Sequence, residues 1–325
     1  MKLKKKNILQ NVNAFTVPRV NEIIYIQDKM IFRNTTPLMT TQRPSNLKCN
    51  ANWITYYENT TRESVVFSSN TNAEVFRFNN VIITLLEEGI LSRDKDGHYL
   101  RDYTNGEIIW ESKIKTRRAI NHKGEIIVFH GLKNSIISSI SKSDGSVNWE
   151  TQLDFNSANN PDRVIVCGVY DDVLWLRFSE RLIGLSLING GIIKDKEETS
   201  LDLKGSLRYS HFDTVNGIFI TGIIHDFSKL DLNTNEVNHF HIEPGEMFKS
   251  FRQVNRVNDF FLLIDDSLSK ICLTDLDFNL LSITKFADPD FDDIQNGIPI
   301  QVYCLNESSL VIKDTSNNFH FYEIQ

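Results

Sequence analysis

Long apolar runs and helical patterning are scarce in this sequence of 325 residues. No apolar stretch approaches the roughly 20 residues that span a bilayer as a helix. The start, MKLKKKNILQNVNAF, is basic like a signal peptide, but asparagine and glutamine residues interrupt the apolar segment that should follow. We therefore expect a cytoplasmic protein that does not bind a membrane.

Cysteines are few and far apart in the chain: Cys49, Cys167, Cys272 and Cys304. There is no CxxC pair and no cysteine–histidine cluster with the spacing of a zinc site. VIVCGVY and QVYCLNE place two of the four inside apolar runs that resemble strands. We expect buried free thiols, although the sequence leaves a disulfide between two of them open.

Catalytic and phosphate-binding motifs are also absent, among them GxSxG, GxxxxGK, GxGxxG and HExxH. Their absence favours a non-catalytic protein, and we expect no catalytic residue, no cofactor and no metal. A site assembled from single residues far apart in sequence would leave no such motif, so an enzyme stays open as an alternative.

The charge of the chain is acidic overall and uneven along its length. The net charge of −7 argues against a dedicated nucleic-acid binder. Residues 1–50 carry nine basic and two acidic side chains, whereas residues 257–300 carry nine aspartates and two lysines. We interpret residues 1–20 as a basic N-terminal tail.

A hairpin signal recurs every 34 to 46 residues. DYTNGEIIWESKI at 102–114 and SKSDGSVNWETQL at 141–153 show it most clearly, because Asn-Gly and Asp-Gly favour tight hairpin turns. The turn positions are Asn72, Gly106, Gly145, Gly190, Glu236 and Asn279. Such a period is typical of repeat architectures.

Four residues after each turn stands a side chain that is apolar in five of six repeats. These residues are Phe76, Trp110, Trp149, Lys194, Phe240 and Ile283. An even spacing keeps each on the same face of its strand. We predict that each ring packs against the neighbouring repeat.

Seven short apolar runs, each preceded by Asn, Asp or Gly, mark the repeats. They begin near residues 52, 80, 124, 172, 216, 258 and 306. They are too short for helices and are rich in Ile, Val, Phe and Leu. The pattern predicts an all-β protein over residues 21–325: a single β-propeller with seven blades of four antiparallel strands.

The final stretch, LVIKDTSNNFHFYEIQ, holds two strands, so the last blade should lack its outer strand. The segment NEIIYIQDKMIFRN at 21–34 has strand character without a hairpin mark. We predict that this N-terminal strand segment completes the last blade and closes the ring, since an open ring would expose a sheet edge.

Three repeats, RLIGLSLINGGII, SIISSISKSDGSVNWE and GHYLRDYTNGEIIWES, resemble the quinoprotein-type (PQQ-like) β-propeller repeat. The resemblance covers residues 50–325 as a pattern. It implies the propeller fold and, in quinone-binding members, adjacent cysteines and a metal site. This chain has no Cys-Cys pair, so we expect the non-enzymatic branch. WD-repeat propellers match less well, because the chain has no Trp-Asp dipeptide.

Two polar clusters are candidate sites. Asp288, Asp290, Asp292 and Asp293 form the densest acidic cluster; they lie in a loop without the Gly and Glu of a standard calcium loop. We expect them to bind a basic partner; a solvated loop and a metal site are the alternatives. His239, His241 and Glu243 share one face of a predicted strand, and solvent-facing alternation is favoured there over a metal site.

The favoured function is a non-catalytic protein-binding propeller. Its most specific form is a cytosolic inhibitor, of the immunity-protein type, that neutralises a basic protein toxin, because an acidic loop steers basic partners. We expect a monomer apart from this partner. The alternatives are a hydrolase or lyase, or a small-ligand sensor, with a site at the central channel.

Overall fold

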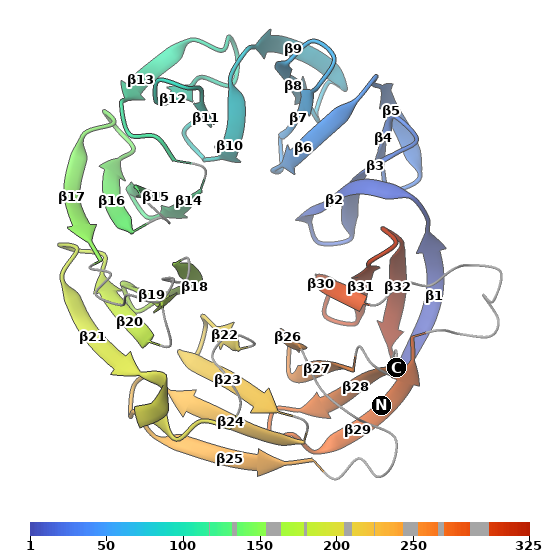
Figure 1. The fold of residues 1–325 in the computed structure, drawn as a ribbon. Helices are drawn as coiled ribbons and strands as arrows, with labels where there is room; N and C mark the ends of the chain where they lie inside the picture. Colours follow the sequence, from blue (N-terminus) through green and yellow to red (C-terminus); the bar gives the residue numbers. More distant parts are fainter. Residues whose placement is uncertain are drawn as a thin grey trace. The chain divides into compact units, whose positions relative to one another are not determined.

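The chain folds into antiparallel β-sheets (Figure 1). The structure, a computed structural model, describes residues 1–116, 118–131, 135–153, 164–178, 181–204, 210–223, 225–242, 253–265, 270–286 and 299–325. In these ranges one 3-10 turn, η2 (Glu198–Leu201), follows β21. No helix in the described ranges is long and apolar enough to cross a membrane.

Eight sheets of four strands are present, so the prediction of seven blades is wrong. The all-β, single-propeller prediction is confirmed. We number the sheets as blades 1 to 8 along the chain. They belong to two compact units, Asn11–Asn159 (the N-terminal unit) and Met1–Gln10 with Asn160–Gln325 (the C-terminal unit).

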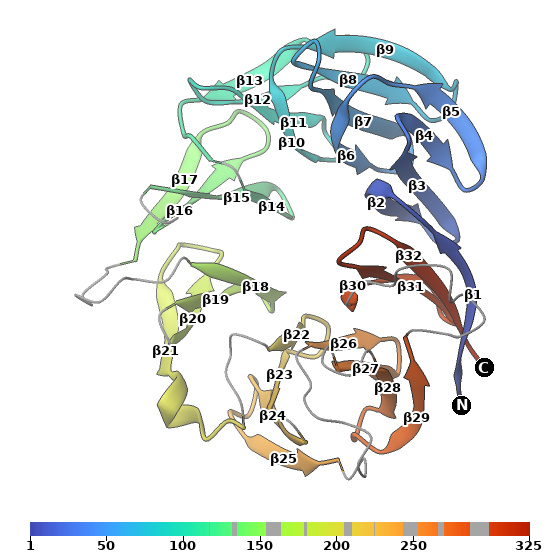
Figure 2. The ribbon, with the colours of Figure 1, turned by 45° about the vertical axis from the view of Figure 1, so that its right-hand side comes forward.

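The N-terminal unit holds blades 1 to 4, each with its strands in sequence order (Figure 2). Their strands are β2 (Val12–Arg19), β3 (Glu22–Gln27), β4 (Met30–Arg33) and β5 (Thr36–Thr40); β6 (Pro44–Cys49), β7 (Trp53–Glu58), β8 (Glu63–Ser68) and β9 (Ala73–Phe78); β10 (Val81–Leu85), β11 (Ile90–Arg93), β12 (His98–Arg101) and β13 (Ile108–Ser112); β14 (Ala119–His122), β15 (Glu125–His130), β16 (Ile136–Ser141) and β17 (Val147–Gln152).

The C-terminal unit holds blades 5 to 8. Their strands are β18 (Ile165–Tyr170), β19 (Val173–Phe178), β20 (Arg181–Ser186) and β21 (Ile192–Glu197); β22 (His211–Asp213), β23 (Ile218–Ile223), β24 (Asp226–Asp231) and β25 (Val237–His241); β26 (Gln253–Val257), β27 (Phe260–Asp265), β28 (Lys270–Asp275) and β29 (Leu280–Lys285); β30 (Pro299–Asn306), β31 (Ser309–Asp314), β32 (Phe319–Ile324) and β1 (Leu3–Leu9).

Blade 1 is the sheet that the sequence analysis missed. Residues 21–34, expected to complete the last blade, instead form β3 and β4 of blade 1. Asn21 precedes β3 with a positive φ of 61°, as Asn258 lies shortly before β27 with a φ of 53°. The turn between β4 and β5 at Asn34 carries neither Gly nor Asp, so the repeat lacked its hairpin mark.

The last blade does take its outer strand from the N-terminus, but the strand is β1 rather than residues 21–34. β1 pairs antiparallel with β32, from Leu3 opposite Ile324 to Leu9 opposite Phe319. Residues 1–20, expected to be a basic tail, contain β1 and β2. The run of lysines concealed a strand because Lys is a common residue of outer strands, where it discourages edge pairing.

Two of the rings placed four residues after the turns, Phe76 and Trp110, pack on the turn of the next blade, as predicted. Phe76 covers Gly106, and Trp110 covers Gly145. The Trp110 indole also donates a hydrogen bond of 2.7 Å to the Lys142 carbonyl. Both glycines have a φ of 74°, and a Cβ on either would meet the ring at 2.7 Å or less, so the contact requires glycine.

Several second and third strands are buried on both faces. β15, β16, β20, β27 and β28 each show four or more consecutive buried residues. The outer strand β17 instead alternates, with Trp149 buried between exposed neighbours. This burial explains why the sequence shows short continuous apolar runs instead of alternation.

Candidate functional site

The predicted acidic site lies outside the described residues. Asp288, Asp290, Asp292 and Asp293 fall within residues 287–298. Their role in binding a partner therefore stays a prediction, and the candidate site is built here from other parts of the chain.

His239 and His241 share one face of β25, but each has its own partner. The His239 ring lies 3.0 Å from the Ser228 hydroxyl and 3.4 Å from Asp202. The His241 Nδ1 lies 2.9 Å from the Asp226 carboxylate. Glu243 falls outside the described residues, and those residues hold no group of three metal-ligating side chains.

A Ser–His–Glu trio in blade 4 lacks the geometry of a nucleophilic relay. The Ser138 hydroxyl lies 2.7 Å from His130 Nε2 and donates a 2.9 Å hydrogen bond to Glu150. In a relay the carboxylate orients the other ring nitrogen. Ser138 is also fully buried, so a substrate does not reach its hydroxyl.

A pocket in the C-terminal unit is the main candidate site; we call it the first-turn pocket. It has a volume of about 800 Å³. The turns between the first and second strands of blades 6, 7 and 8 form it together with β22 and β26. It is lined by His211, Phe212, Asp213, Thr214, Val215, Arg256, Asn258, Asp259, Phe260 and Glu307.

Two side chains of blade 7 hold these three turns together. Arg256 forms an ion pair with the buried Asp213 at the end of β22. Asn258 donates a 2.8 Å hydrogen bond to the Glu307 carbonyl in blade 8. The pocket is therefore fixed before any ligand binds, which reduces the entropy lost on binding.

The Asp213 carboxylate is engaged by other residues of the protein. It accepts hydrogen bonds from the amide of Val215 and from the side chain of Asn216. Burial alone would raise the pKa of Asp213, but these bonds and Arg256 outweigh burial and lower it. Burial also lowers the pKa of His211. The ion pair and the neutral imidazole leave the floor of the pocket without net charge.

The rim of the pocket, in contrast, carries two exposed carboxylates and an exposed apolar side chain. Asp259 and Glu307 are exposed, and neither carboxylate has an ion-pair partner among the described residues. Val215 is 80% exposed on a turn that Asp213 holds in place. The rim therefore offers one apolar contact beside two negative charges, which suits a partner with a basic and an apolar side chain.

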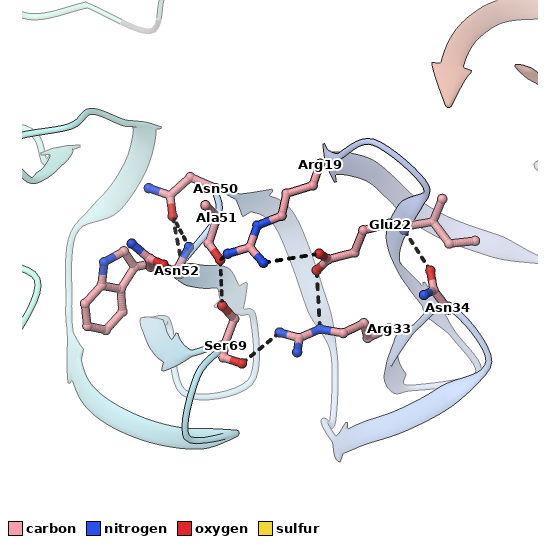
Figure 3. Close-up of polar contacts among 10 residues, drawn as sticks. Arg19, Glu22, Arg33, Asn34, Asn50, Ala51, Asn52 and Ser69 are labelled. Carbon is pink, nitrogen blue, oxygen red and sulfur yellow. Dashed lines mark hydrogen bonds and ion pairs between the residues drawn. The ribbon is translucent and has the colours of Figure 1, made fainter. Parts of the chain in front are cut away.

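The N-terminal unit ties its first turns together in a related way (Figure 3). Arg19, at the end of β2, donates a hydrogen bond to the Ala51 carbonyl in the turn of blade 2. Glu22 lies 3.9 Å from Arg19 and 3.4 Å from Arg33. Arg33 donates to the Ser69 carbonyl, and the Ser69 hydroxyl donates to Ala51. This Arg–Glu–Arg cluster joins blades 1 and 2.

Sequence reasoning missed both groups of turn residues. Arg256 and Asp213 stand 43 positions apart, and Arg19 and Ala51 stand 32 apart. Only the repeat register places them together. The usable signal was the Asn, Asp or Gly that precedes the second strands, which marks the turns that carry these residues.

No protein family and no curated protein matches the sequence. Solved structures match it over nearly the whole chain, however. BamB from Moraxella catarrhalis is 10% identical with a TM-score of 0.61, covering 99% of this chain and 100% of that one. Saccharomyces cerevisiae Sqt1 is 11% identical with a TM-score of 0.62, over 100% of both chains.

The C-terminal WD40 domain of Sif2 is 10% identical with a TM-score of 0.65, covering 99% of this chain and 98% of that domain. At such low identity these likenesses show the β-propeller fold alone. Membership in the quinoprotein-type repeat family stays a prediction. The chain is thus similar in fold to β-propellers of the WD40 and BamB kinds.

Proposed function

We propose that the protein is a non-catalytic β-propeller that binds a protein partner at the first-turn pocket. The observation that carries the proposal is the rim of that pocket: Val215 is exposed beside the carboxylates of Asp259 and Glu307, which have no ion-pair partner among the described residues. A fixed apolar and acidic rim favours a partner segment that carries a lysine or arginine next to an apolar residue.

The experiment compares partner capture by three purified baits in a lysate of the source organism. The baits are the wild type, Val215→Arg, and Ile188→Arg as the matched control. Val215 and Ile188 are both 80% exposed on turns, so the two substitutions cost similar stability, but Ile188 lies outside the pocket. We expect one partner to bind the wild type and the Ile188 variant and to be lost from the Val215 variant.

The captured partner is then titrated against Asp259→Lys with Glu307→Lys at low and high salt. We expect the double variant to weaken binding and to remove most of its salt dependence. Binding that survives both the Val215 and the double substitution contradicts the site. A wild-type bait that captures no protein contradicts the proposed function itself.

A narrower proposal is the neutralisation of a basic toxin in the cytoplasm. It rests on the acidic stretch Asp288, Asp290, Asp292 and Asp293 and on the steering that such charge exerts. Changing these four residues to lysine should abolish binding of the captured partner at low salt. Unchanged affinity, or a partner that is itself acidic, contradicts the toxin proposal and leaves the first-turn pocket to be judged separately.

A further inference from the structure

A second, smaller pocket lies in the N-terminal unit and is built only from first strands; we call it the Lys48 pocket. Its volume is about 280 Å³. β2, β6 and β10, the first strands of blades 1, 2 and 3, contribute all of its residues. These are Phe15, Thr16, Leu47, Lys48, Cys49, Thr84 and Leu85.

The pairing of all three strands is irregular beside this pocket. Register shifts fall between Thr16 and Arg19 in β2, between Ser45 and Lys48 in β6, and between Ile82 and Thr84 in β10. β14, the first strand of blade 4, pairs regularly and lines no part of the pocket. β-bulges re-aim side chains and are frequent beside functional sites. Register shifts also occur in the first strands β18 and β30, so the three bulges shape this pocket but do not identify it as a site by themselves.

Lys48 supplies the one charge among the residues that line this pocket. Within the described part of the chain, its ammonium has no carboxylate partner. Burial lowers the pKa of Lys48, and no neighbouring acid offsets this effect. A half-buried cation without a counter-charge is costly, and a bound anion would remove that cost.

The other lining groups define the rest of the ligand. Thr16 and Thr84 add hydroxyl groups, which can donate to an oxyanion. Phe15, Leu47 and Leu85 add an apolar wall. One cation balances one negative charge, so a singly charged carboxylate fits better than phosphate, whose charge at neutral pH is greater.

Cys49 does not add covalent chemistry to this pocket. Burial raises the pKa of its thiol far above the ordinary value, and the nearby Glu22 raises it further. The thiolate is the nucleophilic form of cysteine, so a thiol held neutral is inert at neutral pH. The pocket is therefore suited to reversible binding.

The pocket is also held in shape before ligand arrives. Arg19 ends β2, three residues after Thr16, and Ala51 follows β6 two residues after Cys49. The hydrogen bond between them fixes the ends of these two strands against each other (Figure 3). Asn46 in β6 donates a 2.7 Å hydrogen bond to the Ile82 carbonyl in β10, which fixes the third strand.

We propose that the Lys48 pocket binds a small monocarboxylate with a short apolar tail, its carboxylate against Lys48 and the two threonine hydroxyls. This site is independent of partner binding at the first-turn pocket. It makes the protein a receptor for a small acid as well as a binding protein.

The experiment uses butyrate as the probe and the full chain labelled at its leucine methyl groups. Butyrate should shift the methyl resonances of Leu47 and Leu85 in a saturable way. Lys48→Met should weaken the affinity about 10- to 100-fold, because it removes a charge-assisted hydrogen bond. Lys95→Met, at an exposed turn of the same unit, should leave the affinity unchanged. Thr84→Val should weaken it less than Lys48→Met.

Three outcomes would overturn the proposal. In the first, butyrate shifts neither leucine. In the second, Lys48→Met binds butyrate as the wild type does. In the third, n-butylamine or inorganic phosphate binds the pocket at least as tightly as butyrate. If Lys48→Met fails to fold, the proposal is tested by the butyrate affinity of Thr84→Val and by the affinities of the wild type for n-butylamine and inorganic phosphate.

Discussion

Gly145 stands where any side chain would collide with the ring of Trp110. A Cβ at this position would lie 2.6 Å from the indole, and the backbone has a φ of 74°. Gly145→Ala should therefore lower the free energy of unfolding by about 1 to 3 kcal/mol, through overpacking and backbone strain. Urea unfolding measures the change.

Gly124→Ala is the matched control in the same blade. Gly124 has no atom within 4 Å of an added Cβ and no positive φ. We expect it to be neutral or slightly stabilising. Equal losses at the two positions would show that the ring-on-turn contact does not matter to stability.

Lys48 should lower the free energy of unfolding of the ligand-free protein. Replacing it with methionine keeps the length of the side chain and removes the unpaired charge. Lys48→Met should raise the free energy of unfolding by about 0.5 to 2 kcal/mol. Lys95→Met should change it little, and thermal melts of both variants provide the measurement. A destabilised Lys48→Met would indicate that the ammonium has a structural partner.

At the scale of elements, the loss of strand β1 can be compensated by a separate peptide that pairs with β32. The pairing of β1 with β32 extends over six residue pairs, and Leu3 is buried in a core cluster with Tyr322 and Leu310. A chain that begins at Asn11 leaves the edge of β32 unpaired, so we expect a lower melting temperature and aggregation.

A synthetic peptide of residues 1–10 should restore the melting temperature of that shortened chain, because main-chain pairing drives strand addition. The same peptide with Leu3→Asp is the control and should fail. If the shortened chain melts like the full chain without peptide, β1 contributes nothing to the stability of the sheet.

The strands also show how much of the fold could be predicted from the sequence. Runs such as EIIVFH and FFLLID were recognisable because both faces of their strands are buried, and the rings after the turns were recognisable because glycine must lie beneath them. Blade 1 was missed because its turn at Asn34 carries no Asn-Gly or Asp-Gly pair and its strands lie next to a lysine-rich stretch that resembled a tail. The two pockets were missed because each joins three repeats through single residues without a motif of their own.

For the whole molecule, buried histidines make stability depend on pH. Burial lowers the pKa of His98 to about 4 and lowers those of His130, His211 and His320. In the unfolded chain histidine titrates at about 6.5. The unfolded state therefore binds protons first, and stability is lost as the pH falls from about 6.5 toward about 4.

Urea midpoints at about pH 7.5 and about pH 4.5 test this dependence. The midpoint should fall at the lower pH, and His98→Gln should reduce the fall, since the amide keeps an acceptor for Thr116 and does not titrate. An equal fall in the wild type and in His98→Gln would exclude His98 as a source.

The sheet that contains β1 and β32 has a consequence for biosynthesis. Lys2 and Gln325 exchange both backbone hydrogen bonds, so residues far apart in sequence close the same ladder. During translation, blades 1 to 7 have all their strands before β32 leaves the ribosome, whereas blade 8 does not. A chain that stops before Phe319 therefore keeps an open, apolar edge that chaperones and proteases recognise. Completion of this one sheet therefore depends on strands from both ends of the propeller, β1 and β32.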